Sequence, residues 1–157
     1  MKKLIFKSFV LMLILAAFMS CTSTSTSKLI SIEDHTFARS DDSGQMVTVE
    51  DPAVFKRGED VHLILLNVGP FKKDETGLNW FDLDMEVSGP DGAVLLSETS
   101  MLGDAGHMAL ENDRAKSPYG SCTHTNDLQP GKYKFSLTIY DKVGKGSAKQ
   151  TAYFTLE

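Results

Sequence analysis

Four residues with soft metal-binding side chains lie in one irregular part of the chain. They are His107, Met108, Cys122 and His124. Copper takes histidine, cysteine and methionine as ligands, and zinc takes histidine and cysteine. A periplasmic copper or zinc site is therefore one interpretation of this region, although no Cys-x₂-Cys pair and no His-Glu-x₂-His motif occurs. The other interpretation is that these side chains pack in a core, where cysteine and methionine are common.

A second candidate set alternates along residues 80–87, so that its side chains share one face of an expected strand. It consists of Trp80, Asp82, Asp84 and Glu86. A row of carboxylates could ligate Ca²⁺, but calcium sites usually use loops that wrap around the ion. Alternating acids are also typical of the wet face of an antiparallel sheet. We therefore expect these acids to form a solvated face.

Aromatic side chains beside polar groups indicate a binding surface. Trp80 stands near Asp82 on the outward face, and Tyr119 follows Ser117 and Pro118 in the irregular region. Aromatic rings flanked by carboxylates and amides suit sugar rings or peptides. The sequence thus predicts Trp80, Asp82 and Tyr119 as binding residues for a protein or glycan partner. The alternative for Trp80 is packing against the long loop or an N-terminal strand.

Motifs of catalysis and of cofactor binding are few. No Gly-x-Ser-x-Gly elbow occurs. Gly144 and Gly146 lie in a turn between expected strands, not at the strand-to-helix junction of a nucleotide loop. Cys122 and His124 could form a thiolate pair, but two residues with this spacing on a strand do not define the required geometry. The sequence predicts a protein that is not an enzyme and uses no cofactor.

The elements that must hold these residues are short strands. Period-two alternation and Gly/Pro turn signals predict strands within 28–37, 46–50, 61–68, 80–87, 93–98, 127–141 and 151–156. We expect the first to be an edge strand. The run at 61–68 is apolar on both faces, which is typical of a central strand covered on both sides. No segment shows helical periodicity over three turns.

Residues 99–126 show no sustained period of either kind. Loops longer than ~12–15 residues in a compact domain tend to be functional, or to contain structure that the pattern hides. Short strands near 107–110 and 119–123 would account for part of the region. The whole pattern, about seven to nine short strands separated by turns, predicts an all-β sandwich.

The segment LQPGKY at residues 128–133 resembles the Leu-x-Pro-Gly-x-Tyr of fibronectin type III and related immunoglobulin-like domains. The resemblance implies an immunoglobulin-like antiparallel β-sandwich. It also implies a tyrosine corner, in which the hydroxyl of Tyr133 bonds to nearby backbone. Sandwiches with unrelated functions share this motif, so it indicates a fold and not an activity.

Residues 1–20 have the features of a signal peptide helix. Three lysines precede an apolar run at 9–19, which is too short to span a membrane because a span needs ~20 residues. The segment 18–21 (FMSC) resembles the lipobox of bacterial lipoproteins, with Phe18 in place of the usual leucine. The resemblance implies cleavage before Cys21, a lipid on its thiol and attachment to a membrane through acyl chains such as palmitate. The alternative is an ordinary secretory signal that leaves Cys21 free.

The remaining chain divides into a Ser/Thr-rich tether at 21–27 and a single domain at 28–157. All 21 acidic residues follow the signal, while three of the 16 basic residues precede its end, so the mature chain is more acidic than the full-length charge of −5. This balance argues against nucleic acid as a partner. In a Gram-negative host, Thr22 after the cysteine favours attachment to the outer membrane. In any other host we expect attachment to the cell membrane. We expect a lipid-anchored cell-envelope protein that acts as a non-catalytic binding or structural module.

Overall fold

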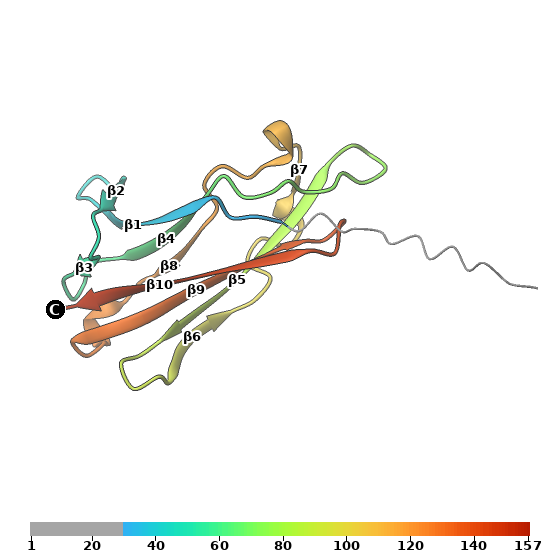
Figure 1. The fold of residues 1–157 in the computed structure, drawn as a ribbon. Coiled ribbons are helices and arrows are strands. Elements are labelled where there is room, and N and C mark those ends of the chain that lie inside the picture. The colour runs from blue at the N-terminus through green and yellow to red at the C-terminus, as the bar shows by residue number, and fades with distance from the viewer. Residues whose placement is uncertain (1–29) are drawn as a thin grey trace, which may run out of the picture.

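The computed structural model describes residues 30–157, which form two β-sheets packed face to face (Figure 1). The smaller sheet has the strand order β2–β1–β4–β8, and all of its pairings are antiparallel. Its strands are β1 (Asp34–Ser40), β2 (Met46–Val49), β4 (Val61–Leu66) and β8 (Tyr119–Cys122).

The larger sheet has the order β3–β10–β9–β5–β6, and β7 also pairs with β5. Its strands are β3 (Val54–Phe55), β5 (Asn79–Ser88), β6 (Val94–Glu98), β7 (His107–Met108), β9 (Gly131–Asp141) and β10 (Ser147–Leu156). The predicted all-β sandwich is confirmed. The strand count is ten, above the prediction, because two-residue strands such as β3 and β7 leave no periodic pattern. The predicted signal peptide helix and Cys21 lie outside the described residues.

The core between the sheets is organised around an aromatic cluster. Phe154 on β10 lies at its centre, with ring centroids 5.2 Å from Tyr133 and 5.8 Å from both Phe37 and Phe55. Phe37 belongs to β1 and the other rings to the larger sheet, so the cluster joins the two layers. The inward residues predicted for β5 and β9 are all buried, namely Phe81, Leu83, Met85, Val87, Tyr133, Phe135, Leu137 and Ile139.

The first strand differs from its prediction. The sequence predicts an edge strand within 28–37, whereas β1 begins at Asp34 and lies between β2 and β4. Asp41 explains the difference, because its carboxylate accepts the backbone N–H groups of Ser43 (2.8 Å) and Gln45 (2.9 Å) and closes a hairpin. That hairpin adds β2 to the outer side of β1, so β2 is the edge strand.

β4 is the central strand that the sequence predicts, but its two faces differ. Val61, Leu63 and Leu65 point into the core and are fully buried. On the outer face Ile64 is only half-buried, and His62 is covered by polar side chains from its neighbours. The prediction that this strand is covered on both sides therefore holds in full for the core face and only in part for the outer face, where His62 is buried and Ile64 is not.

The unpatterned region at 99–126 contains more structure than its sequence predicts. β7 and β8 confirm the short strands expected there. Two 3₁₀ helices also lie in it, η1 (Gly103–Gly106) and η2 (Glu111–Asp113), and a third, η3 (Thr125–Asp127), begins at its end. Within residues 30–157, no helix has the length and apolar character that crossing a membrane requires.

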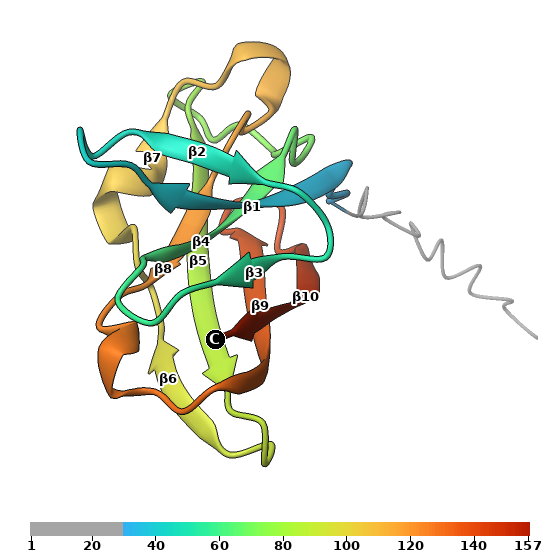
Figure 2. The ribbon, with the colours of Figure 1, turned by 90° about the vertical axis from the view of Figure 1, so that its left-hand side faces the viewer.

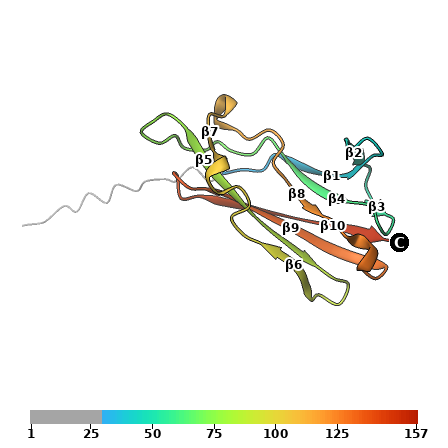
Figure 3. The same ribbon diagram turned by 180° about the vertical axis from the view of Figure 1, so that it is seen from behind.

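β6, η1 and β7 follow one after another along a single edge of β5 (Figure 3). Between β6 and β7, the backbone ladder along β5 is reduced to one hydrogen bond in the described chain. The Met101 N–H donates it to the Leu83 carbonyl (2.9 Å). η1 comes so close to β5 that a Cβ on Gly106 would lie 1.8 Å from the Phe81 carbonyl oxygen. Glycine is therefore required at this crossing.

The tyrosine corner implied by the LQPGKY segment is present at the start of β9. The Tyr133 hydroxyl donates to the Gln129 carbonyl at 2.5 Å, and the ring is 1% exposed. Gly131 has φ +152°, and a Cβ there would lie 2.5 Å from Cγ of Pro90. The Pro-Gly turn thus needs its glycine because the 89–92 turn lies against it.

We expect Tyr133→Phe to lower the free energy of unfolding by about 1 kcal/mol, because it removes one buried hydrogen bond and leaves the Gln129 carbonyl without that donor. Urea denaturation of both proteins measures the difference. Tyr153→Phe is the matched control, since Tyr153 is 54% exposed on β10, and it should leave stability unchanged. Equal stability of Tyr133→Phe and the parent would contradict a stabilising corner.

Candidate functional site

The acidic face of β5 is not the solvated row that its alternation predicts. Asp82 is only 2% exposed, and Asp84 and Glu86 are half-buried. The expectation of a solvated face is therefore wrong for Asp82. The physical reason is the interruption between β6 and β7, which frees backbone amides that turn towards the carboxylates.

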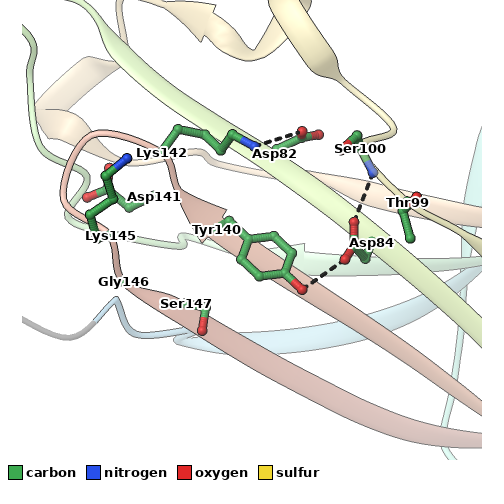
Figure 4. Close-up of a pocket in the computed structure, with 10 residues that line it drawn as sticks. All are labelled: Asp82, Asp84, Thr99, Ser100, Tyr140, Asp141, Lys142, Lys145, Gly146 and Ser147. Atoms are coloured by element: carbon green, nitrogen blue, oxygen red, sulfur yellow. Dashed lines mark hydrogen bonds and ion pairs between the residues drawn. The ribbon is translucent and has the colours of Figure 1, made fainter.

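These carboxylates replace part of the missing strand ladder. Oδ1 of Asp82 accepts the N–H groups of Leu102 (3.0 Å) and Gly103 (3.4 Å). Oδ1 of Asp84 accepts the N–H of Ser100 (2.9 Å), as Figure 4 shows. The two side chains thus fasten the segment between β6 and β7 to the edge of β5.

A polar pocket of about 530 Å³ lies beside these carboxylates on the outer face of the larger sheet (Figure 4). β5, the end of β9, the β9–β10 turn and the start of β10 form it, together with the residues that follow β6. Its lining consists of Asp82, Asp84, Thr99, Ser100, Tyr140, Asp141, Lys142, Lys145, Gly146 and Ser147. Strands therefore supply five of the ten lining residues, and the β9–β10 turn and the segment after β6 supply the other five.

The pocket combines opposite charges with hydroxyl groups. The Tyr140 hydroxyl donates to Oδ2 of Asp84 at 2.8 Å. Nζ of Lys142 lies 3.7 Å from Oδ2 of Asp82, and the side chains of Lys145 and Ser147 complete the rim. A ligand here would meet hydrogen-bond donors and acceptors together.

Asp141 has a different task at the back of the pocket. It is 5% exposed, and its carboxylate accepts backbone N–H groups from Lys72 (2.9 Å), Val143 (3.1 Å) and Gly144 (2.7 Å). These bonds fix the β9–β10 turn that presents Lys142 and Lys145.

Two groups of the pocket have shifted pKa values. Burial alone would raise the pKa of Asp82, but the N–H groups of Leu102, Leu83 and Gly103, together with the charge of Lys142, outweigh it and lower the pKa. The hydrogen bond to Asp84, followed by burial, raises the pKa of Tyr140. At neutral pH the pocket therefore holds ionised Asp82 beside a neutral phenol.

The three predicted binding residues do not converge. Asp82 lines the polar pocket. Trp80 packs its ring on His107, with centroids 5.2 Å apart, and its Nε1 donates to the Gly103 carbonyl (3.1 Å). Tyr119 is 47% exposed and lies on the other sheet, beside a separate apolar groove. For Trp80, the structure matches the alternative of packing against the long loop.

The four soft metal ligands do not come together either. His107 and Met108 pair with the start of β5, where Nε2 of His107 contacts the Asp74 carboxylate (2.7 Å). Cys122 instead pairs with Val61 in the other sheet. Among residues 30–157, no three His, Cys, Asp or Glu side chains lie close enough together to hold a metal ion. The geometry therefore gives no support to the metal interpretation.

Cys122 is a core side chain. It is 3% exposed, and burial, together with the nearby charge of Asp60, raises the pKa of its thiol. Because the thiolate is the nucleophilic form, this environment opposes reactivity. His124 has a positive φ of 59°, and its ring contacts Thr123 rather than Cys122.

Sequence reasoning misses a polar network on the outer face of the smaller sheet. Nδ1 of His62 lies 2.7 Å from the Ser121 hydroxyl, and Nε2 lies 2.9 Å from the Ser40 hydroxyl. The Ser40 hydroxyl in turn contacts Asp60 (3.4 Å). The three side chains come from β4, β8 and β1, so only the strand register reveals their contact.

We expect the domain to lose stability as the pH falls through the histidine range because of His62. Burial lowers the pKa of His62, an effect that Asp60 partly opposes. The unfolded chain therefore binds this proton at higher pH than the folded one, so stability is full above the ordinary pKa of about 6.5 and falls below it, by at most about 1.4 kcal/mol per pH unit. Urea midpoints at pH 7.5 and pH 5 measure the loss. His62→Gln should reduce the dependence of stability on pH, whereas the control His124→Gln, at an exposed position, should leave it unchanged. An equal pH dependence in both variants would contradict the assignment to His62.

The fold and site together define a β-sandwich domain with a polar pocket on the larger sheet. No protein-family model matches the sequence, and no curated protein matches it. Among solved structures, the C-terminal domain of wzt is similar with a TM-score of 0.51 and 13% identity, over 82% of this chain and 73% of that chain. The soluble domain of PmoD from Methylocystis sp. ATCC 49242 (Rockwell) gives a TM-score of 0.37 and 12% identity, over 78% and 90%. At such identities, the likeness to wzt concerns the fold alone.

Proposed function

We propose that this protein is an exported bacterial lipoprotein, held on the cell envelope through Cys21, whose β-sandwich is a non-catalytic glycan-binding module. The apolar run that ends at the FMSC segment supports the anchor. In a Gram-negative host the membrane is the outer one, and otherwise it is the cell membrane.

The polar pocket is the observation that carries the binding function. Sugar hydroxyl groups both donate and accept hydrogen bonds, and here Lys142, Lys145 and Ser147 lie beside the carboxylates of Asp82 and Asp84. Strands hold Asp82, Asp84 and Ser147 in place before a ligand arrives, which reduces the entropy lost on binding.

The condition of the carboxylates supports a non-catalytic role. Glycoside hydrolysis needs a pair of carboxyl groups, one of which remains protonated as a general acid. Asp82 has a lowered pKa, and it holds the N–H groups of Leu102 and Gly103. Asp84 is likewise engaged with Tyr140 and Ser100. Both carboxylates therefore have structural partners.

A glycan array probed with the purified protein tests the pocket, followed by calorimetric titration of the glycans that bind. Ser147→Trp should abolish binding, because an indole at this exposed position would fill the pocket. Lys149→Trp is the matched control, since Lys149 is exposed two residues further along the same face of β10. Binding of no glycan, or equal loss in both variants, would rule out the pocket.

We expect Cys21→Ser to abolish the incorporation of labelled palmitate and to release the protein from the membrane fraction. A hydroxyl cannot form the thioether through which the lipid is attached. Growth with radiolabelled palmitate, followed by fractionation, measures both effects. Cys122→Ser is the control, because that thiol lies in the core and its loss should leave the label in place. Label that persists in Cys21→Ser would contradict the lipid anchor.

A further inference from the structure

Among residues 30–157, no strand pairs with the outer edge of β8, which leaves backbone hydrogen-bonding groups unused there. β8 pairs with β4 so that Gly120 lies opposite Leu63 and Cys122 opposite Val61. The bond from the Leu65 N–H to the Pro118 carbonyl (2.8 Å) sets the phase of this ladder. Because alternate residues of an antiparallel pair face the partner strand, the N–H and C=O groups of Tyr119 and Ser121 point away from β4.

The other sheet edges have features that hinder strand addition. β6 has a bulge opposite Val87 and Ser88. β3 is only two residues long. β2 is followed directly by the acidic residues Glu50 and Asp51. β8, with the sequence YGSC, has no charge, no proline and no bulge within it, and so lacks the usual protection of an edge.

An apolar groove of about 400 Å³ runs beside this edge. Phe81 and Leu83 of β5 contribute to it, with Met101 and Leu102 from the segment after β6 on one side and Tyr119 on the other. The edges of β6 and β8 lie on the same side of the molecule (Figure 2). The groove therefore lies where the two sheets of the sandwich remain open.

Charge indicates which occupant suits the groove. Glu98 is the one charged residue in its lining within the described chain, and the protein as a whole is acidic, with a net charge of −5. A second copy would bring two acidic surfaces together, whereas a segment with a lysine or arginine would complement Glu98.

We propose that the β8 edge is a docking site for an extended segment of a partner protein, which adds as a fifth strand to the smaller sheet. Its backbone bonds to Tyr119 and Ser121, alternate apolar side chains enter the groove, and a basic residue faces Glu98. Main-chain bonds supply affinity in such strand addition, and the side-chain pockets supply specificity. The groove shares no lining residue with the polar pocket, although β5 and the segment after β6 border both, so each proposal is tested by variants at its own residues and can fail without the other.

A matched pair of substitutions tests the backbone contact. Ser121→Pro removes the outward N–H, and an edge strand tolerates proline where the N–H faces solvent. Ser121→Ala loses the same hydroxyl, and with it the His62 contact, but keeps the N–H. A phage library that displays random ten-residue peptides is selected for binding to the full chain, purified in detergent. Phages that also bind the Ser121→Pro variant are removed in each round.

The selected peptides should alternate apolar and polar residues and contain lysine or arginine. Their affinity should fall about tenfold for Ser121→Pro and remain unchanged for Ser121→Ala. Glu98→Lys should bind acidic peptides in preference to the basic ones. Circular dichroism of each variant verifies folding. No enrichment over Ser121→Pro would overturn the proposal. Sedimentation showing a dimer that Ser121→Pro dissociates would also overturn it, by identifying a second copy as the occupant.

Discussion

Replacing Phe154 with alanine is expected to lower the free energy of unfolding by about 3–5 kcal/mol, the range for large aromatic side chains removed from a core. Phe154 is 1% exposed and contacts aromatic rings from both sheets. The cavity would lie where the layers join and could not close without moving a strand. Since small domains are stable by only about 5–15 kcal/mol, a large share of the total is at stake.

Urea denaturation measures this loss of stability. If the alanine variant does not fold, the contribution of the ring is measured with Phe154→Leu instead. We expect the leucine variant to lose less, because it retains most of the buried volume. Tyr153→Ala is the matched control, since Tyr153 is the preceding residue on the opposite, exposed face of β10. It should lose less than about 1 kcal/mol, the value of its exposed contact with Lys132. A loss in Phe154→Ala as small as in this control would show that the cluster does not hold the sheets together.

The strand framework was readable from the sequence because alternation reports burial directly. The inward residues of β9 and the Tyr133 corner needed no knowledge of the partner strands. Pairings between distant strands could not be read in this way. Tyr140 lies opposite Asp82 because β9 pairs with β5, and nothing in either segment specifies that register.

The acidic row of β5 shows the limit of pattern reading. Alternation assigns Asp82 to the outer face correctly, but burial there depends on the neighbouring strand. The interruption between β6 and β7 brings the amides of Leu102 and Gly103 to that face. The sequence of residues 99–106 has no periodic pattern that would reveal these amides. In the sequence, the buried Asp82 therefore looks like an exposed acid. The same limit hides the His62 network, in which three strands each contribute one side chain.

We expect Asp82→Ala to lower the free energy of unfolding by about 2–3 kcal/mol, because hydrogen bonds to an ionised group contribute about 1.5–3 kcal/mol and the amides of Leu102 and Gly103 lose their acceptor. Asp82→Asn should lose less, since its amide oxygen can still accept. Glu86→Ala is the matched control on the same face. Within residues 30–157 its carboxylate makes one long contact, 3.9 Å from Nζ of Lys134, and the substitution should change stability by less than about 0.5 kcal/mol.

The pH dependence separates the charge of Asp82 from its packing. Since the pKa of Asp82 is lowered in the folded protein, its charge stabilises the domain above the unfolded value of about 3.9, and this contribution disappears as the pH falls through the lower, folded pKa. The difference in stability between the parent and Asp82→Asn should therefore be constant from pH 5 to pH 8 and shrink below pH 4. Urea midpoints across that range measure it. A difference that stays constant into acid would mean that Asp82 acts through shape alone, and that the ionised carboxylate is not what fastens the segment between β6 and β7 beside the pocket.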